Sequence, residues 1–178
     1  AALLRAVNLP GHQKVGMDAL RACLGSTGLT DVRTVLQSGN VVFGGAVPKP
    51  EAMESLLEKA SAKEFGFATH FFVRTGKDLE RILTNNPFPR AAKDDPGHLV
   101  VLFLKGHVSA PTVADLQRSI RDREQVRGEG REIYLVYPDG IGRSRLTLPT
   151  IEKKLGTRGT ARNWNTVTKL AALVAGAA

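Results

Sequence analysis

The stretch that decides the fold is Val32-Arg33-Thr34-Val35-Leu36-Gln37-Ser38-Gly39-Asn40-Val41-Val42-Phe43. Two runs rich in β-branched and aromatic residues flank the polar sequence Gln37-Ser38-Gly39-Asn40, whose glycine tolerates positive φ. This pattern predicts a β-hairpin with strands at residues 32–36 and 41–43. The elements on either side of the hairpin then indicate which kind of sheet it joins.

Helical and extended segments alternate around this hairpin in the first half of the chain. A short apolar strand at 3–7 and a helix with apolar residues at 17, 20, 23 and 24 precede it. A helix that opens at Pro50 and a strand at 69–73 follow it, and a further helix at about 77–84 leads into Asn85-Asn86-Pro87-Phe88-Pro89, a sequence typical of a break. The predicted order is β-α-β-β-α-β and then a helix.

The second half repeats this order. It predicts a strand at 98–104, a helix at 112–120, strands at 124–127 and 132–137, a helix at 148–155, an extended piece around 160–162 and a last helix at about 163–174. Matching elements lie roughly 90 residues apart, which favours an internal duplication. The β-α-β-β-α-β order is that of the ferredoxin-like unit, an antiparallel sheet with both helices on one face.

We therefore expect an α+β fold of two tandem ferredoxin-like units, each followed by an extra helix. The predicted subdomains are residues 1–90 and 91–178, joined in one compact globule. The proline-rich stretch at 87–96 is then a connector inside that globule.

The charge of the chain is basic and uneven. Its 178 residues contain 25 lysines and arginines against 17 aspartates and glutamates, a net charge of +8. Residues 118–169 alone hold 12 of the cations and 6 of the anions. This surplus favours an anionic partner, either a small molecule or a nucleic acid.

Other features of the composition bound the function by exclusion. Cys23 is the only cysteine, so no disulfide forms within the chain, and we expect a reducing cytoplasm. The longest apolar tail, 170–175, is far shorter than the roughly 18 residues of a membrane span, so we expect no membrane partner. The four histidines, at 12, 70, 98 and 107, lack metal-ligand spacing, which predicts no metal and no cofactor.

A candidate anion site lies in Gly140-Ile141-Gly142-Arg143-Ser144-Arg145, between a predicted strand and a predicted helix. Arg143, Ser144 and Arg145 offer fixed cations and a hydroxyl donor next to helix-start amides, a combination that suits phosphate. Arg162 and Asn163 are expected beside this loop. The alternative is an ordinary turn with solvated arginines, and Asn163 is also a good helix N-cap.

A second set of polar candidates comes from the first half of the chain. These residues stand at predicted strand ends and turns, and they are Arg5, Asn8, Gln37, Ser38 and Asn40. The simplest interpretation of the last three is a hairpin turn.

No motif in the sequence specifies a reaction. The loop at 140–145 lacks the third glycine of a dinucleotide fingerprint, and no Walker-type phosphate loop or nucleophile elbow occurs. The leading interpretation is non-catalytic binding of a phosphate-containing anion, either a nucleotide or a nucleic-acid backbone. The alternatives are a phosphoryl- or acyl-handling enzyme that uses the same arginines and serine, and an interaction module whose basic face meets an acidic protein.

Several strings in fixed order carry a family resemblance. They are Leu3-Leu4-Arg5-Ala6-Val7-Asn8, Leu36-Gln37-Ser38-Gly39-Asn40-Val41-Val42-Phe43, Asn86-Pro87-Phe88, Gly142-Arg143-Ser144-Arg145-Leu146 and Thr160-Ala161-Arg162-Asn163-Trp164-Asn165-Thr166-Val167. Together they resemble the uncharacterised bacterial family known as domain of unknown function 1697. The resemblance implies a duplicated ferredoxin-like α+β fold in a small soluble protein, and it implies no established activity.

Overall fold

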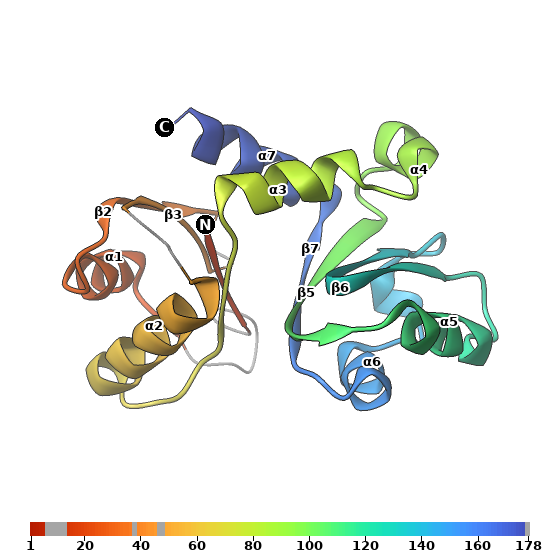
Figure 1. Ribbon diagram of the computed structural model, residues 1–178, viewed down its shortest axis with the longest axis horizontal. Helices are drawn as coiled ribbons and strands as arrows, with labels where there is room; N and C mark the ends of the chain where they lie inside the picture. The colour runs from red at the N-terminus through yellow and green to blue at the C-terminus, as the bar shows by residue number, and fades with distance from the viewer. Residues whose placement is uncertain (6–13, 37–38, 46–48, 177–178) are drawn as a thin grey trace. The chain divides into compact units, whose positions relative to one another are not determined.

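The computed structural model describes residues 1–5, 14–36, 39–45 and 49–176 (Figure 1). The chain divides into two compact units. Unit 1 consists of Ala1–Glu80 and Leu170–Ala178, and unit 2 consists of Arg81–Lys169. The chain passes from one unit to the other inside two helices, α3 (Gly76–Thr84) and α7 (Trp164–Ala175).

Unit 1 contains the hairpin and the elements around it. Before α3 the order is β1 (Ala2–Leu4), α1 (Met17–Gly25), β2 (Thr30–Val35), β3 (Asn40–Gly44), α2 (Pro50–Phe65) and β4 (Phe71–Val73). The sheet order is β2-β3-β1-β4, and every neighbouring pair is antiparallel. The predicted hairpin is confirmed, because β2 pairs with β3 up to Val35 opposite Asn40.

Both faces of β1, β3 and β4 are buried, whereas most residues of the edge strand β2 are not. On one face, alternate strand residues pack against Leu20 and Leu24 of α1 and Leu57 of α2, which lie on that side of the sheet (Figure 1). The strand residues of this core are Ala2, Leu4, Val41, Phe43, Phe71 and Val73. On the opposite face Leu3, Val42 and Phe72 are also at most 4% exposed, so these three strands are covered on both sides although they are short.

Unit 2 begins within α3 and continues with seven further elements. They are α4 (Pro89–Asp94), β5 (Leu99–Val108), α5 (Ala110–Ser119), β6 (Gln125–Val136), α6 (Leu148–Leu155), β7 (Gly159–Asn163) and the first residues of α7. A 3₁₀ turn (Ile141–Arg143) lies between β6 and α6. The sheet order is β6-β5-β7 with antiparallel neighbours.

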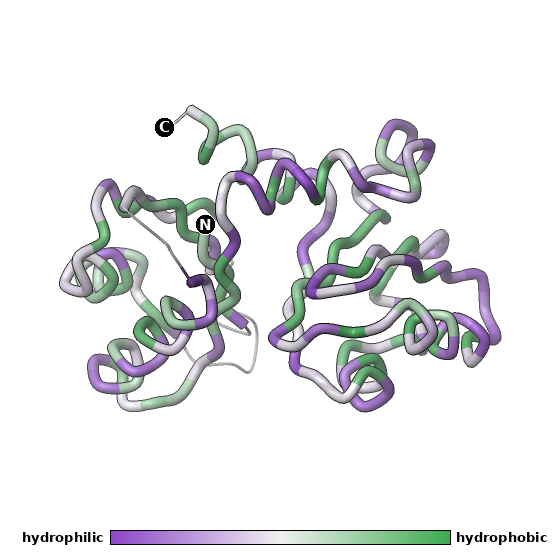
Figure 2. The backbone as a smooth tube through the Cα atoms, in the orientation of Figure 1, coloured by the Kyte–Doolittle hydropathy of each residue, from purple (hydrophilic) through white to green (hydrophobic). Residues whose placement is uncertain are grey.

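The centre of unit 2 is β5, whose first part Figure 2 shows as hydrophobic. Residues 99–104 are all buried. On one face, Val100, Leu102 and Leu104 share a core with Val113 and Leu116 of α5 and with Ile151 and Leu155 of α6. A strand that is paired on both edges and covered on both faces reads as an unbroken apolar run, as this one does.

The first difference concerns the proline-rich connector. Residues 87–96 are predicted as a connector, and they contain a short helix that the sequence analysis does not predict, α4, with Pro89 in its first turn. Proline fixes the backbone φ that a first helical turn needs, and Arg90-Ala91-Ala92-Lys93 consists of good helix formers. The predicted break therefore ends at Pro89.

The second difference concerns the strands predicted at 124–127 and 132–137, which both fall within β6. A side chain at Gly128 would lie 3.0 Å from the carbonyl oxygen of Glu132 and 3.1 Å from the Cα of Ile133. Four residues of extended strand span about 13 Å, so the chain must reverse direction within β6. Gly128 and Gly130 have φ values of 122° and 79°, which permit this reversal.

The second sheet thus has three strands where the duplication predicts four, and the tandem ferredoxin-like duplication is not confirmed. What the structure shows is a mixed fold of helices and two antiparallel sheets, one of four strands and one of three. Within the described residues, no helix is both long enough and apolar enough to cross a membrane.

Candidate functional site

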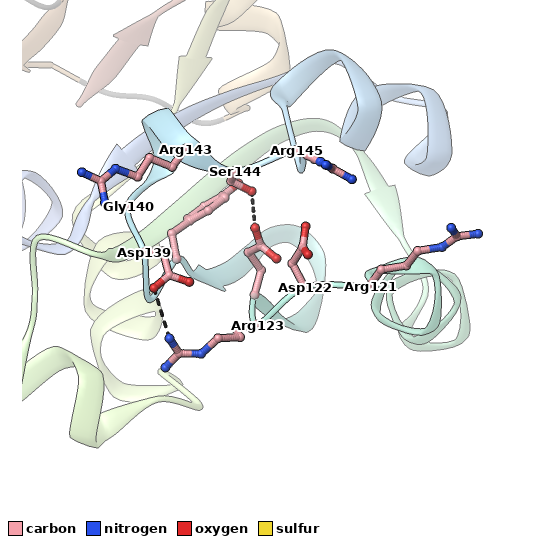
Figure 3. A pocket seen from close by; sticks show the side chains of 10 residues that line it. Arg121, Asp122, Arg123, Asp139, Gly140, Arg143, Ser144 and Arg145 are labelled. Atoms are coloured by element: carbon pink, nitrogen blue, oxygen red, sulfur yellow. Dashed lines mark hydrogen bonds and ion pairs between the residues drawn. The ribbon is translucent and has the colours of Figure 1, made fainter.

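The candidate site is a surface pocket of about 530 Å³ in unit 2 (Figure 3). Two loops form most of it, the loop between α5 and β6 and the loop between β6 and α6. Its lining residues are Arg121, Asp122, Arg123, Glu124, Tyr137, Asp139, Gly140, Arg143, Ser144 and Arg145. We call this the arginine pocket, because four of the ten side chains are arginines.

The backbone of the second loop is held by its own hydrogen bonds. The amide of Arg143 donates to the carbonyl of Gly140 at 3.2 Å, and the amide of Ser144 donates to Ile141 at 3.3 Å. The amide of Thr147 donates to Arg145 at 2.9 Å. No residue of α6 lines the pocket. Polar contacts from this loop to a ligand would therefore come mainly from side chains rather than from a row of helix-start amides.

Ser144 connects the two loops. Its hydroxyl donates to Oε1 of Glu124 and accepts from the backbone amide of Leu146 at 2.9 Å (Figure 3). Because Glu124 lies 20 residues earlier in the chain, this pair of bonds fixes one loop against the other. Ser144 therefore has a structural task in addition to its position in the pocket wall.

Tyr137 lies in the same wall. Its hydroxyl donates to the carbonyl of Leu146 at 3.2 Å. Burial of the ring, and secondarily the negative charge of Glu124, raise the pKa of Tyr137 to about 12. The phenol therefore stays protonated across the physiological range and acts as a fixed hydrogen-bond donor.

The arginines of the pocket differ in their partners. Arg123 forms an ion pair with Asp139 at 3.1 Å. Arg121, Arg143 and Arg145 are exposed and form no ion pair with any residue that the structure describes. In Figure 3 the side chains of Arg143 and Arg145 extend in opposite directions from Ser144. The pocket thus combines three arginines that form no ion pair with a described carboxylate and one arginine, Arg123, that Asp139 holds in place.

The structure places the remaining second-half candidates outside this lining. Arg162 lies on β7 opposite Val101 and donates to the hydroxyl of Thr160 at 2.9 Å and to the carbonyl of Ala161 at 2.8 Å. Burial lowers the pKa of the Arg162 guanidinium to about 10. Asn163 caps α7, since its side-chain oxygen accepts from the amide of Thr166 at 3.0 Å.

The first-half candidates belong to unit 1. Asn40 is fully buried on β3, and its side-chain amide donates to the carbonyl of Val35 at 3.1 Å, which closes the hairpin. The backbone of Arg5 donates to His70 and accepts from the hydroxyl of Thr69. Asn8, Gln37 and Ser38 lie outside the described residues. A ligand-binding role for these residues stays a prediction.

Sequence reasoning missed six of the ten residues that line the pocket. Arg121, Arg123 and Glu124 come from the run Arg121-Asp122-Arg123-Glu124, which alternates in charge directly after α5. Such a run between a helix and a strand is a signal of a charged loop. That it faces the loop at 140–145 depends on contacts between distant parts of the chain, which the run itself does not specify.

In the described part of the chain, no group of three or more histidine, cysteine, aspartate or glutamate side chains is arranged to hold a metal ion. His12, one of the four histidines considered from the sequence, lies outside the described residues.

Comparisons with known proteins identify the family and the fold. A family model described as "Protein of unknown function (DUF1697)" matches residues 1–134. The loop at 140–145 lies beyond this match. The structure is similar to that of the conserved bacterial protein SP0830 from Streptococcus pneumoniae, with a TM-score of 0.76 and 23% sequence identity over 98% of this chain and 96% of that one.

This likeness shows a shared fold and carries no activity with it. No curated protein matches the chain. The family match covers three quarters of the sequence and includes three of the five strings that carry the resemblance, while the strings at 142–146 and 160–167 lie beyond it. The chain therefore belongs to the family of proteins of unknown function DUF1697.

Proposed function

We propose that the arginine pocket binds a phosphate-containing anion and that the protein acts through this binding rather than by catalysis. The observation that carries the proposal is the presence of Arg121, Arg143 and Arg145 around one pocket with no ion pair to a described residue. Guanidinium groups bind phosphate through paired hydrogen bonds, and cations without a carboxylate partner are available for such bonds.

The distribution of charge between the units supports the proposal. Unit 2 carries 16 lysines and arginines against 9 aspartates and glutamates, whereas unit 1 carries 9 against 8. Nearly the whole net charge of +8 therefore belongs to the unit that contains the pocket. A positive unit attracts anions before contact and raises the rate at which they arrive.

The carboxylates in the pocket limit how strongly a simple anion binds. Asp139 is paired with Arg123, and Glu124 accepts a hydrogen bond from Ser144. Four arginines face three carboxylates, so the net charge of the lining is small. We expect modest affinity for phosphate alone and a dependence on the exposed arginines.

A charge reversal with a matched control tests this site. Arg143→Glu together with Arg145→Glu should weaken binding of adenosine monophosphate, measured by calorimetry, at least about tenfold. Arg90→Glu together with Lys93→Glu makes the same change in total charge on α4, outside the pocket, and should change the affinity less than about threefold. Equal losses in both double variants, or no loss in the first, would refute the anion site.

A nucleic-acid backbone is a second candidate ligand, favoured by the charge surplus of unit 2. Its mark is the salt dependence of binding. The logarithm of the affinity should fall linearly with the logarithm of the salt concentration, at a slope of roughly 0.7 to 0.9 for each phosphate contact. A small phosphate ligand with one or two contacts gives a much shallower slope.

We propose further that the two units are related by duplication. The reversal inside β6 supports this, because it divides the strand into two arms and gives unit 2 the order β-α-β-β-α-β of unit 1. A second similarity also supports it. Glu54 of α2 accepts from the amide of Val73 at 2.8 Å, and Glu152 of α6 accepts from the amide of Gly159 at 2.8 Å. In each unit a buried glutamate joins the second helix to the strand after it.

A further inference from the structure

Glu124 differs from the other two carboxylates that line the arginine pocket, Asp122 and Asp139, because it is buried. It is only 8% exposed, and its Oε1 accepts the hydrogen bond from Ser144. Its other carboxylate oxygen, Oε2, is buried and has no hydrogen-bond partner among the residues that the structure describes. Buried polar atoms are almost always paired, so this oxygen calls for an explanation.

The surroundings of Glu124 restrict what its partner is. The nearest cation of the same loop, Arg123, is paired with Asp139 at 3.1 Å, and Ser144 already uses its single hydrogen on Oε1. Glu124 lines the pocket, so we consider a hydrogen-bond donor held in the pocket as the partner of Oε2. A carboxylate oxygen accepts well from a hydroxyl, and it repels an unprotonated phosphate oxygen.

We propose that the ligand of the arginine pocket carries a hydroxyl group beside its phosphate and that Glu124 accepts a hydrogen bond from this hydroxyl through Oε2. The proposal rests on the anion site proposed above and specifies the class of its ligand: a hydroxyl-bearing phosphate ester, such as a sugar phosphate or a nucleoside phosphate. The exposed arginines hold the phosphate, and the buried carboxylate recognises the hydroxyl.

The size of the pocket agrees with this class. Small-molecule sites have volumes of roughly 300 to 1,000 Å³, and the arginine pocket has about 530 Å³, more than a phosphate group alone requires. The remaining volume leaves room for the hydroxyl-bearing part of such an ester beside its phosphate.

The first experiment compares ligands on the unmodified protein by calorimetry. Ribose 5-phosphate and adenosine monophosphate both carry a phosphate and neighbouring hydroxyl groups, whereas methyl phosphate carries the phosphate alone. We expect at least one of the two hydroxyl-bearing esters to bind about tenfold or more tightly than methyl phosphate, since a hydrogen bond to a charged group is a strong one. Which of the two binds more tightly identifies the source of the hydroxyl.

The second experiment assigns the preference to Glu124. In Glu124→Gln the charged acceptor is lost. The ratio of the affinity for the hydroxyl-bearing ester to the affinity for methyl phosphate should therefore fall about tenfold. Glu129→Gln makes the same substitution at an exposed residue outside the pocket and should leave the ratio as it is. Because the first experiment needs no variant, the proposal stays testable if Glu124→Gln does not fold.

The outcomes separate this inference from the proposed function. One outcome is that methyl phosphate and the hydroxyl-bearing esters bind equally tightly and that Arg143→Glu with Arg145→Glu abolishes the binding of all of them. The anion site then stands, the role of Glu124 is refuted, and a water molecule is the partner of Oε2. If Glu124→Gln keeps the full preference, the inference also fails. If no phosphate ligand binds at all, both proposals fail together.

Discussion

Two residues, Tyr134 and Tyr137, account for all the tyrosine in the protein. The hydroxyl of Tyr134 donates to the carbonyl of Ile82 at 2.8 Å, and that of Tyr137 donates to Leu146 at 3.2 Å. Burial raises the pKa of each phenol to about 12. An acid whose pKa is raised by folding stabilises the folded state below its unfolded pKa and loses this contribution as the pH rises through the folded value.

The tyrosines therefore predict a pH dependence at the alkaline end. Ultraviolet absorbance of the folded protein should show no phenolate at pH 10 and half-ionisation near pH 12. The free energy of unfolding should decrease as the pH rises from about 10 to about 12, because the unfolded chain releases both protons near pH 10. Tyr134→Phe should remove half of the absorbance change. A full phenolate signal near pH 10 in protein that is still folded would contradict the prediction.

Single elements were predictable where their signals are local. Helix α6 begins and ends where the sequence predicts, since Pro149 lies in its first turn and Gly156 follows its last residue with a φ of 68°. The hairpin of β2 and β3 was also predictable from a local signal, its turn sequence. The arginine pocket was predictable only in part, because the contact of Ser144 with Glu124 joins residues 20 positions apart. The two strands predicted at 124–127 and 132–137 implied that the chain reverses within β6, but they did not predict how tight the turn is.

The reversal within β6 makes a prediction about two neighbouring glycines. Gly128→Ala should lower the free energy of unfolding by about 3 kcal/mol or more, because the new Cβ meets backbone atoms at 3.0 and 3.1 Å and φ is 122°. Gly130→Ala, at a φ of 79° with no atom within 4 Å, should cost only about 1 kcal/mol. Denaturant unfolding measures both values. Similar losses in the two variants would indicate that β6 does not fold back at Gly128.

At the scale of the whole molecule, the notable feature is that unit 1 is assembled from both ends of the sequence. Residues 170–178 belong to it, although all of unit 2 separates them from residue 80. Leu170 is fully buried, and Val174 lies against Gly76, where an added Cβ would be 3.3 Å from the valine side chain. The subdomain boundary predicted between residues 90 and 91 does not include the return of residues 170–178 to unit 1. This boundary stays a prediction.

This arrangement predicts which unit a substitution at the buried Leu170 of α7 destabilises. Leu170→Ala should destabilise the protein by about 2 to 5 kcal/mol, the usual cost of a cavity at a buried leucine. Hydrogen exchange should increase most within residues 1–80, which belong to the same unit although they are far from residue 170 in the sequence. Leu173→Ala, in the same helix but 39% exposed, should change exchange in these residues little. Increased exchange confined to unit 2 would contradict the division of the chain.

The division inside α7 also affects the order in which the protein matures on the ribosome. Domains usually fold as they are synthesised, beginning with the N-terminal one. Here residues 1–80 emerge first but lack Leu170–Ala178, which emerge after every residue of unit 2. Unit 2 is contiguous in the sequence, so it can be completed while unit 1 still waits for its last segment. Of the two units, the one whose translation begins earlier is therefore the one that is completed later.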